Sequence, residues 1–92
     1  MIKFEWDPTK ADSNLTKHGV SFAEAATAFA DGLSLTIFDP EHSESEDRFV
    51  LLGMSAYGRL LVVSHTDRDG TIRLISARTA NRKEQTQYEA KH

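Results

Sequence analysis

Two apolar runs joined by a short turn are the strongest indication of the fold class: Arg59-Leu-Leu-Val-Val-Ser-His-Thr66 and Thr71-Ile-Arg-Leu-Ile-Ser-Ala77, with Asp67-Arg-Asp-Gly70 between them. β-Branched residues favour strands, and a short connection that ends in Gly is typical of a hairpin, so these runs are predicted to pair antiparallel. The segments 33–38 and 48–54 have a similar composition, and the short connection 55–58 also ends in Gly. We therefore expect four consecutive strands.

Helix signals precede these strands. Asp7 followed by Pro8 is typical of a helix start and Gly19 of a helix end, which predicts a helix over 8–17. The tetrapeptide Ser21-Phe-Ala-Glu24 matches a capping box, in which the Ser oxygen accepts from one free N–H and the Glu carboxylate reaches back to another. A second helix is therefore expected from this point to Asp31-Gly32. Its apolar stripe, expected in the core, consists of Phe22, Ala25, Ala26 and Phe29.

The two ends of the chain add one strand and one helix. Residues 2–6 alternate apolar and polar, which predicts a short half-buried strand. Residues 79–91 contain strong helix formers and neither Gly nor Pro, and this polar helix is expected to dock through Tyr88 or to be held by a partner. The order β-α-α-β-β-β-β-α predicts an α+β domain whose helices gather on one face of an antiparallel sheet and leave the other face free.

The composition is that of one small globular domain. The 92 residues are 39 % apolar and 27 % charged, so a single domain over 1–92 with a modest core is expected. The absence of cysteine excludes disulfides, thiolate chemistry and a Cys-ligated zinc site. The sequence contains neither a membrane-spanning run nor a signal-peptide pattern, which predicts a cytoplasmic protein.

The charged residues are segregated along the chain. The net charge of −3 by itself disfavours nucleic-acid binding. However, the segment 39–47 holds five acidic residues and no Lys or Arg, whereas Lys and Arg outnumber Asp and Glu over 68–91. We expect 39–47 to be a mobile loop and predict a narrow basic face on an acidic protein.

A set of short motifs spans nearly the whole chain. It comprises Phe4-Glu-Trp-Asp-Pro8, Asn14, Lys17-His-Gly-Val-Ser-Phe22, His42-Ser with Glu46-Asp-Arg48, and Ile75-Ser-Ala-Arg78 followed by Arg82, Glu84 and Tyr88. In order and spacing this set closely resembles the BrnT family of type II toxins. The resemblance implies a RelE-like fold and metal-independent cleavage of RNA without a cofactor. It also implies inhibition by a BrnA-like antitoxin with a ribbon-helix-helix part, through which alone DNA would be contacted.

Metal-free cleavage of RNA can use the ribose 2′-OH as nucleophile, and it then requires a base, an acid and cations near the phosphate. Arg48 and Arg78, at the ends of two predicted strands, are the expected phosphate-binding groups because a guanidinium presents a rigid fork of donors. Arg78 is the leading candidate, since Arg78, Arg82 and Lys83 crowd the start of the last helix, where the macrodipole favours an anion. The structural alternative is that Arg78 and Arg82 pair with Glu84 or with the acidic loop.

Three side chains are candidates for the acid or the base. The imidazole of His65 suits proton transfer near neutral pH, but its alternation with Leu61 and Val63 fits a core histidine equally well. His18 belongs to the family-like motif, although capping of the first helix also explains it. Glu46 lies two residues before Arg48, so it is either the base or, slightly favoured, the ion-pair partner of that arginine.

The chemical type of the remaining side chains indicates whether they contact RNA, pack in the core or bind a metal. RNA contacts are expected from the remaining basic and aromatic residues: Lys17, Arg73, Arg82, Lys83 and Tyr88. Trp6 is expected in the core. The segment with His42, Asp39, Glu41 and Glu44 superficially suggests a metal site, but a flexible loop offers no fixed geometry, so no metal is expected.

Two functions fit these observations. The first is a ribonuclease toxin, and the second is a non-catalytic module whose basic helix and open sheet face bind only a small protein partner. The net negative charge supports the second. RNA cleavage by the purified protein separates the two, and DNA binding by the chain itself is disfavoured because no helix-turn precedes the basic helix.

Overall fold

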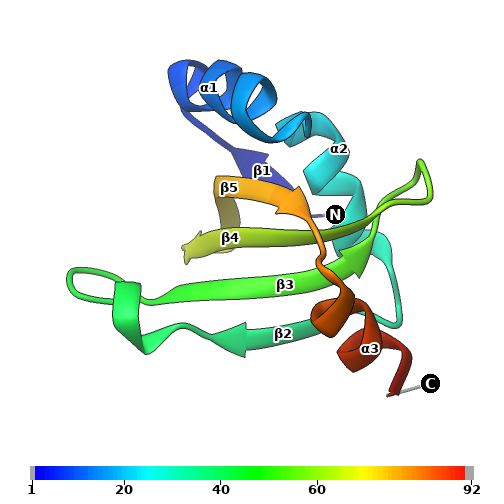
Figure 1. Ribbon diagram of the computed structural model, residues 1–92. Coiled ribbons are helices and arrows are strands. Elements are labelled where there is room, and N and C mark those ends of the chain that lie inside the picture. Colours follow the sequence, from blue (N-terminus) through cyan, green and yellow to red (C-terminus); the bar gives the residue numbers. More distant parts are fainter. Residues whose placement is uncertain (1, 91–92) are drawn as a thin grey trace.

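The computed structural model describes residues 2–90, which form a five-stranded sheet with helices packed on both of its sides (Figure 1). In chain order the elements are β1 (Lys3–Glu5), α1 (Pro8–His18), α2 (Phe22–Thr27), the 3-10 helix η1 (Ala28–Ala30), β2 (Leu35–Phe38), the 3-10 helix η2 (Pro40–His42), β3 (Arg48–Met54), β4 (Leu60–Arg68), β5 (Thr71–Thr79) and α3 (Arg82–Ala90). The α+β class and the order of the elements are confirmed. The expected helix end at Lys91 lies outside the described residues. Within residues 2–90, no helix is both long and apolar enough to cross a membrane.

The strands lie in the order β1-β5-β4-β3-β2. The turn between β4 and β5 is Asp69-Gly70, whose φ angles of 53° and 86° are the left-handed values that a tight hairpin turn uses. The pairs β2–β3, β3–β4 and β4–β5 are antiparallel as expected. β1 pairs parallel with β5, so the sheet is mixed. The alternating pattern of β1 indicates a strand but neither its partner nor its direction.

A bulge interrupts β5. Leu74 pairs with His65 and Ser76 pairs with Ser64, which leaves Ile75 without a partner on β4. An extra residue shifts the alternation of side chains by one position, so residues before and after it exchange faces. As a result, Arg73 and Arg78 lie on the same face of the sheet.

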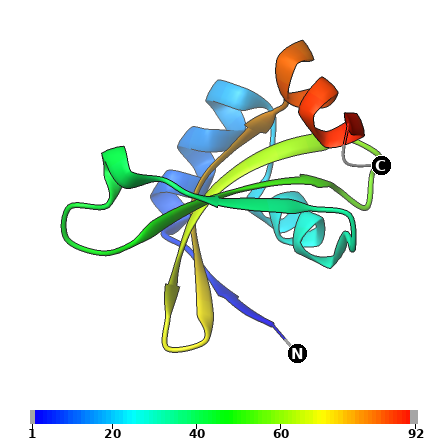
Figure 2. The ribbon, with the colours of Figure 1, turned by 90° about the horizontal axis from the view of Figure 1, so that it is seen from below.

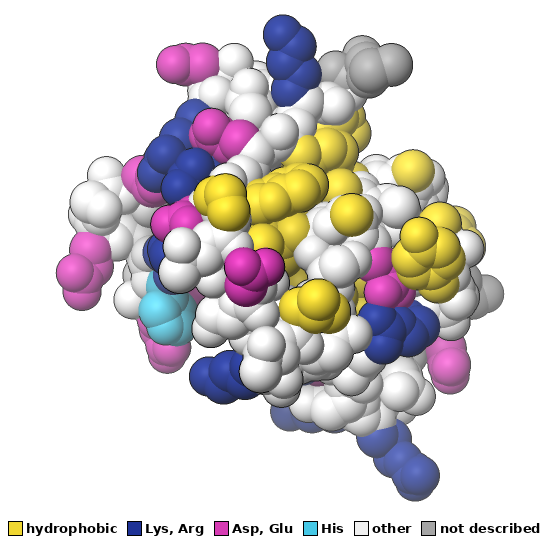
Figure 3. All heavy atoms as spheres, turned by 90° about the horizontal axis from the view of Figure 1, so that it is seen from above, with side chains coloured by type: hydrophobic (Ala, Val, Ile, Leu, Met, Phe, Trp, Pro, Cys, Tyr) yellow, Lys and Arg dark blue, Asp and Glu magenta, His cyan; other side chains and the backbone are white. Residues whose placement is uncertain are grey.

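α1 and α2 cover one face of the sheet, and the core lies between these helices and the sheet (Figures 1 and 2). The buried apolar residues there are Val20, Phe22, Ala25, Leu61, Val63, Leu74 and Ala77, and Ala26 and Phe29 pack against them. Trp6 contacts Phe22 edge to face with a centroid distance of 6.0 Å, in agreement with its expected place in the core. Figure 3 views this side of the molecule, where apolar side chains gather between charged ones. The expected apolar stripe of the second helix is therefore confirmed.

One side chain covers the outer edge of β5 where β1 ends. β1 pairs only with 71–73, and beyond them β5 runs beside α1. There the amide of Asn14, 6 % exposed, accepts a hydrogen bond from Ala77 N at 3.0 Å and donates to Ala77 O at 2.8 Å and Val20 O at 2.9 Å. Asn14 thus takes the place of a neighbouring strand for one residue and satisfies backbone groups that would otherwise be buried without partners.

An ion pair between buried Glu24 and partly exposed Arg59 connects α2 to the turn between β3 and β4. Ser21 Oγ accepts from Glu24 N at 3.0 Å, as the capping box predicts. The carboxylate of Glu24 accepts instead from Ser55 Oγ at 2.8 Å and from Arg59, whose Nε lies 2.9 Å away, and the Arg59 hydrogen bonds lower the pKa of Glu24. The expected return of Glu24 to the backbone of Ser21 is wrong, because a partner distant in sequence uses the carboxylate.

α3 lies on the opposite side of the sheet from α1 and α2 (Figures 1 and 2). Its Glu84 lines a hollow with Val62 and Ser64 of β4, which alternate with the core residues Leu61 and Val63. The expectation that all helices gather on one face therefore holds for α1 and α2 only. We call the face opposite α1 and α2 the open face; α3 covers one end of it.

The docking of α3 through Tyr88 is confirmed. The Tyr88 hydroxyl donates to Asp31 Oδ2 at 2.6 Å, and this bond raises the pKa of Tyr88 to about 12. The same carboxylate accepts from Met54 N at 2.8 Å, so Asp31 joins the end of η1 to the end of β3 and to α3. Tyr88 thus anchors a strongly polar helix to the end of the sheet.

Candidate functional site

The open face carries three side chains in register across three strands. Arg48 of β3 lies opposite Thr66 of β4, which in turn lies opposite Arg73 of β5. Paired residues on neighbouring strands project to the same side of a sheet, so two arginines flank one threonine. We call Arg48, Thr66 and Arg73 the arginine row. It brings together two residues that are far apart in the sequence and were predicted to contact RNA.

The arginine row contains two buried polar atoms without hydrogen-bond partners among the described residues: Arg48 Nε and Thr66 Oγ1. Thr66 is 0 % exposed, so its hydroxyl is sealed from bulk solvent. Buried polar groups in folded proteins nearly always have partners, and each exception calls for an explanation. Both atoms can donate a hydrogen bond, so an anion bound between the two arginines would satisfy them.

Two carboxylates lie near the arginine row. Glu46 accepts from Arg68 Nε at 3.1 Å and from Arg68 Nη2 at 2.8 Å, and these hydrogen bonds lower the pKa of Glu46. Glu5 lies 3.8 Å from Arg73 Nη1, a loose contact. The ion pair expected for Glu46 exists, but its partner is Arg68 rather than Arg48, because the neighbouring strand brings Arg68 closer than the chain itself brings Arg48.

From the arginine row the open face continues into a hollow of about 330 Å³. Its lining includes Val50, Val62, Ser64 and Ser76, with Ile37 and Asp39 toward β2 and with Arg78 and Glu84 toward α3. Arg78 pairs with Val62, and Thr66 is four residues farther along β4, which separates the two positions by roughly 13 Å at the strand repeat. The hollow therefore lies between two arginine-bearing ends of one face.

Arg78 is held by Glu84 through two parallel hydrogen bonds, Nη1 to Oε1 and Nη2 to Oε2, both 2.8 Å long. They raise the pKa of Arg78 and lower that of Glu84. Pairing with Glu84, the structural alternative for Arg78, is thus present. The anion expected at the start of the last helix is a side chain of the protein itself.

Glu84 also caps α3. Its Oε1 accepts from Asn81 N at 2.9 Å, and Asn81 Oδ1 accepts from Glu84 N at 2.8 Å. This reciprocal pair is a capping box that the sequence reading missed, although Asn81-Arg-Lys-Glu84 carries its spacing. The helix consequently begins at Arg82 rather than at Thr79.

The acid or base candidate His18 and three of the predicted RNA contacts, Lys17, Arg82 and Lys83, lie elsewhere. Lys17 and His18 are exposed at the end of α1 and line a smaller hollow of about 190 Å³ together with Ser76, which also borders the larger hollow. Arg82 and Lys83 are exposed in the first turn of α3. The structure therefore groups Arg48, Arg73 and Arg78 on the open face and leaves these four side chains at its margins.

His65 lies on the other side of the sheet, in the core. It is 4 % exposed, and its ring packs edge to face on Phe29 at 4.8 Å and stacks on Phe49 at 6.0 Å. Nδ1 lies 3.1 Å from Val63 O, and burial lowers the pKa of His65. These contacts favour the core histidine of the two roles considered for His65.

The burial of His65 predicts a pH-dependent stability. Below the ordinary value of 6.5 the unfolded chain binds a proton at His65, whereas the folded protein, with its lowered pKa, does not. The stability present above pH 6.5 is therefore lost as the pH falls toward the folded-state pKa. Urea unfolding at pH 7.5 and 5.5 should show a smaller loss for His65→Phe than for the wild type. Equal losses would contradict the prediction.

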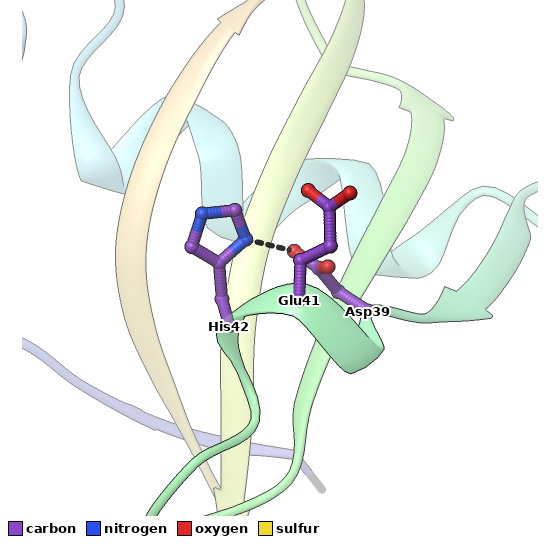
Figure 4. Close-up of side chains that lie close together, drawn as sticks. All are labelled: Asp39, Glu41 and His42. Atoms are coloured by element: carbon purple, nitrogen blue, oxygen red, sulfur yellow. Dashed lines mark hydrogen bonds and ion pairs between the residues drawn. The ribbon is translucent and has the colours of Figure 1, made fainter.

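The acidic segment contains a short helix that was not predicted. This helix is η2, and in the segment one ligand atom each of Asp39, Glu41 and His42 lies within 4.8 Å of the others (Figure 4). His42 Nδ1 and Asp39 Oδ2 are 2.8 Å apart. The pairing of His42 with Asp39 was not predicted, although their i, i+3 spacing within one turn explains it.

The structure defines a small α+β domain with arginines on its open face, and comparison with known proteins identifies the class to which this fold belongs. The solved structure of the Brucella abortus ribonuclease toxin BrnT is similar, with a TM-score of 0.64 and 22 % sequence identity over 89 % of this chain and 100 % of that one. At this identity the likeness concerns the fold. A comparison with curated proteins finds no match.

The family is shown by the sequence. The family model described as the ribonuclease toxin BrnT of type II toxin–antitoxin systems matches residues 6–84. The chain therefore belongs to the BrnT family of ribonuclease toxins, and the resemblance seen in its motifs is confirmed. Membership implies RNA as the class of substrate and an antitoxin as partner.

Proposed function

We propose that this protein is a metal-independent endoribonuclease that cleaves RNA on the open face and thereby stops translation and growth. The observation that carries the proposal is the arginine row, where Arg48 Nε and Thr66 Oγ1 are buried without partners among residues 2–90. A phosphate accepts several hydrogen bonds at once, and arginine presents donors in the matching fork.

The chemistry follows from the RNA itself. When the 2′-oxygen attacks the adjacent phosphorus, negative charge accumulates on the phosphoryl oxygens, and fixed cations stabilise it. Arg48 and Arg73 on either side of the phosphate would supply this charge without a metal ion. Arg68 and Glu46 would position the arginine row, since their ion pair lies beside it.

The neighbouring hollow suits a short single-stranded segment. Its lining combines apolar side chains with the hydroxyls of Ser64 and Ser76, a mixture that can contact a nucleobase and a ribose. Arg78 at the far end would bind a second phosphate once Glu84 releases it. The gathering of Arg48, Arg73 and Arg78 on this one face reconciles RNA binding with the net charge of −3.

The partner proposed is a BrnA-like antitoxin with a ribbon-helix-helix part, acting with the toxin in the cytoplasm. DNA would be bound by the antitoxin. The expected finding is a short ribbon-helix-helix protein encoded next to this gene, whose coexpression restores growth and which copurifies with the toxin.

The test of the proposed function is cleavage of RNA by the purified protein in the presence of EDTA. We expect products that end in a 2′,3′-cyclic phosphate and a 5′-hydroxyl, and no cleavage where the target nucleotide lacks its 2′-OH. Failure of the purified protein to cleave RNA, with no growth arrest on expression, would contradict the proposal. Tight partner binding without cleavage would instead support the interaction module.

A further inference from the structure

The turn that carries His42 is fixed to the start of β3. Asp39 N donates to Arg48 O at 2.8 Å, and Arg48 N donates to Ser43 Oγ at 2.9 Å. Ser43 Oγ in turn donates to Asp39 O. These three bonds join the two ends of the turn to the backbone of Arg48, so His42 has a defined position relative to the arginine row.

The Asp39–His42 bond fixes the tautomer of the imidazole. An ionised carboxylate only accepts hydrogen bonds, so Nδ1 of His42 is the donor to Asp39 Oδ2 at 2.8 Å (Figure 4). In the neutral ring the lone pair then lies on Nε2. A histidine oriented in this way by a carboxylate is ready to take a proton at Nε2, and the carboxylate stabilises the imidazolium that forms.

The imidazole borders the same hollow as the unsatisfied arginine. A hollow of about 300 Å³ is lined by His42 and Arg48, with Glu41, Glu44 and Ser45 as its other walls. The His42 side chain is 59 % exposed and that of Asp39 is 21 % exposed, so the ring is accessible while its partner is held. A phosphate bound at Arg48 would therefore place the adjacent ribose near His42.

We infer that His42, oriented by Asp39, is the base that removes the 2′-OH proton of the RNA bound at the arginine row. The 2′-oxygen forms a bond to phosphorus as the bond from phosphorus to the 5′-oxygen breaks. The 2′-OH proton passes to His42 Nε2, and the departing 5′-oxygen takes a proton from solvent. The inference rests on the proposed function, because it names the base of that reaction.

The remaining candidates for the base are less suited. Glu46 is occupied by two hydrogen bonds from Arg68, which lower its pKa and weaken it as a base. His65 is buried on the opposite side of the sheet. His18 lines the hollow beside α1 rather than the one with Arg48.

The test measures single-turnover RNA cleavage in EDTA with three variants. His42→Ala is expected to lower the rate about 100-fold or more, with RNA affinity unchanged, because general base catalysis contributes at this scale. Added imidazole should restore part of the activity of His42→Ala, which a merely structural role would not allow. Asp39→Asn keeps the backbone bonds of the turn but loses the negative charge that stabilises the imidazolium and fixes the tautomer, so a loss of about 10-fold or more is expected.

Asp12→Asn is the matched control, since Asp12 is an exposed carboxylate of α1 and does not line the hollow with Arg48. It should cleave at the wild-type rate. Glu41→Gln tests for a metal site, since Glu41 is the third member of the cluster with Asp39 and His42. If Glu41→Gln and EDTA both abolish cleavage, the turn is a metal site and the inference is wrong. If the wild type cleaves RNA and His42→Ala is equally active, the inference is wrong but the proposed function stands. If the wild type does not cleave RNA, both the proposed function and the inference are wrong.

Discussion

Replacement of Arg48 by alanine is expected to slow RNA cleavage by about 100- to 1000-fold, the loss typical when one preorganised donor to a developing negative charge is removed. Arg48 Nε is buried and has no partner within residues 2–90, so its hydrogen-bonding capacity is available to a ligand. Arg73 is held near Glu5, at 3.8 Å, and would compensate only in part. Cells that express the Arg48→Ala variant should grow.

The fold should tolerate this change. The hydrogen bonds of Arg48 to Asp39 and Ser43 use backbone atoms, which alanine retains. Arg48→Lys, which keeps the charge but not the fork of donors, should cleave at an intermediate rate. Lys10→Ala removes an exposed cation from α1 and should leave cleavage unchanged. Cleavage by Arg48→Ala within threefold of the wild type would show that the arginine row is not the phosphate site.

Replacement of Asn14 by alanine is expected to lower the free energy of unfolding by about 3 to 5 kcal/mol, because each buried backbone group left without a partner costs about 1 to 3 kcal/mol. Three such groups depend on Asn14: Ala77 N, Ala77 O and Val20 O. The total stability of a domain of this size is about 5 to 15 kcal/mol, so the variant should be close to unfolding.

Urea unfolding measures the effect of Asn14. Asn14→Asp should be at least as harmful as Asn14→Ala, since its carboxylate accepts from Ala77 N but faces the two carbonyl oxygens without a donor. Thr16→Ala, at an exposed position of α1, is the control and should change stability by less than about 0.5 kcal/mol. An Asn14→Ala variant as stable as this control would contradict the role assigned to Asn14.

Both ends of α1 were predictable because capping is local. Asp7 Oδ1 accepts from Thr9 N at 2.8 Å, and Gly19 has a φ of 69°, so both boundaries of α1 depend on side chains and backbone within a few residues. The ion-pair partners of Glu24 and Glu46 were not predictable in this way. Arg59 and Arg68 reach them across the fold, and sequence spacing carries no information on such pairs.

The sequence predicted the residues of the site but not their arrangement in space. Arg48 and Arg73 were both named, yet only strand register puts them on either side of Thr66. In a regular strand Arg73 and Arg78 would project to opposite faces, because their positions differ by an odd number. The bulge at Ile75 puts both side chains on the same face of the sheet, and no short motif in the sequence indicates that bulge.

The carboxylate of Glu84 has two partners at once, Arg78 and the start of α3. It neutralises Arg78 and it caps α3, so an anion that takes Arg78 from Glu84 changes how firmly the first turn of that helix is held. By thermodynamic linkage, a ligand that binds better when Glu84 holds Arg78 weakens the binding of an external phosphate at Arg78, and the phosphate weakens the binding of that ligand by the same free energy. A protein that clamps the last helix would thereby inhibit RNA binding without touching the arginine row.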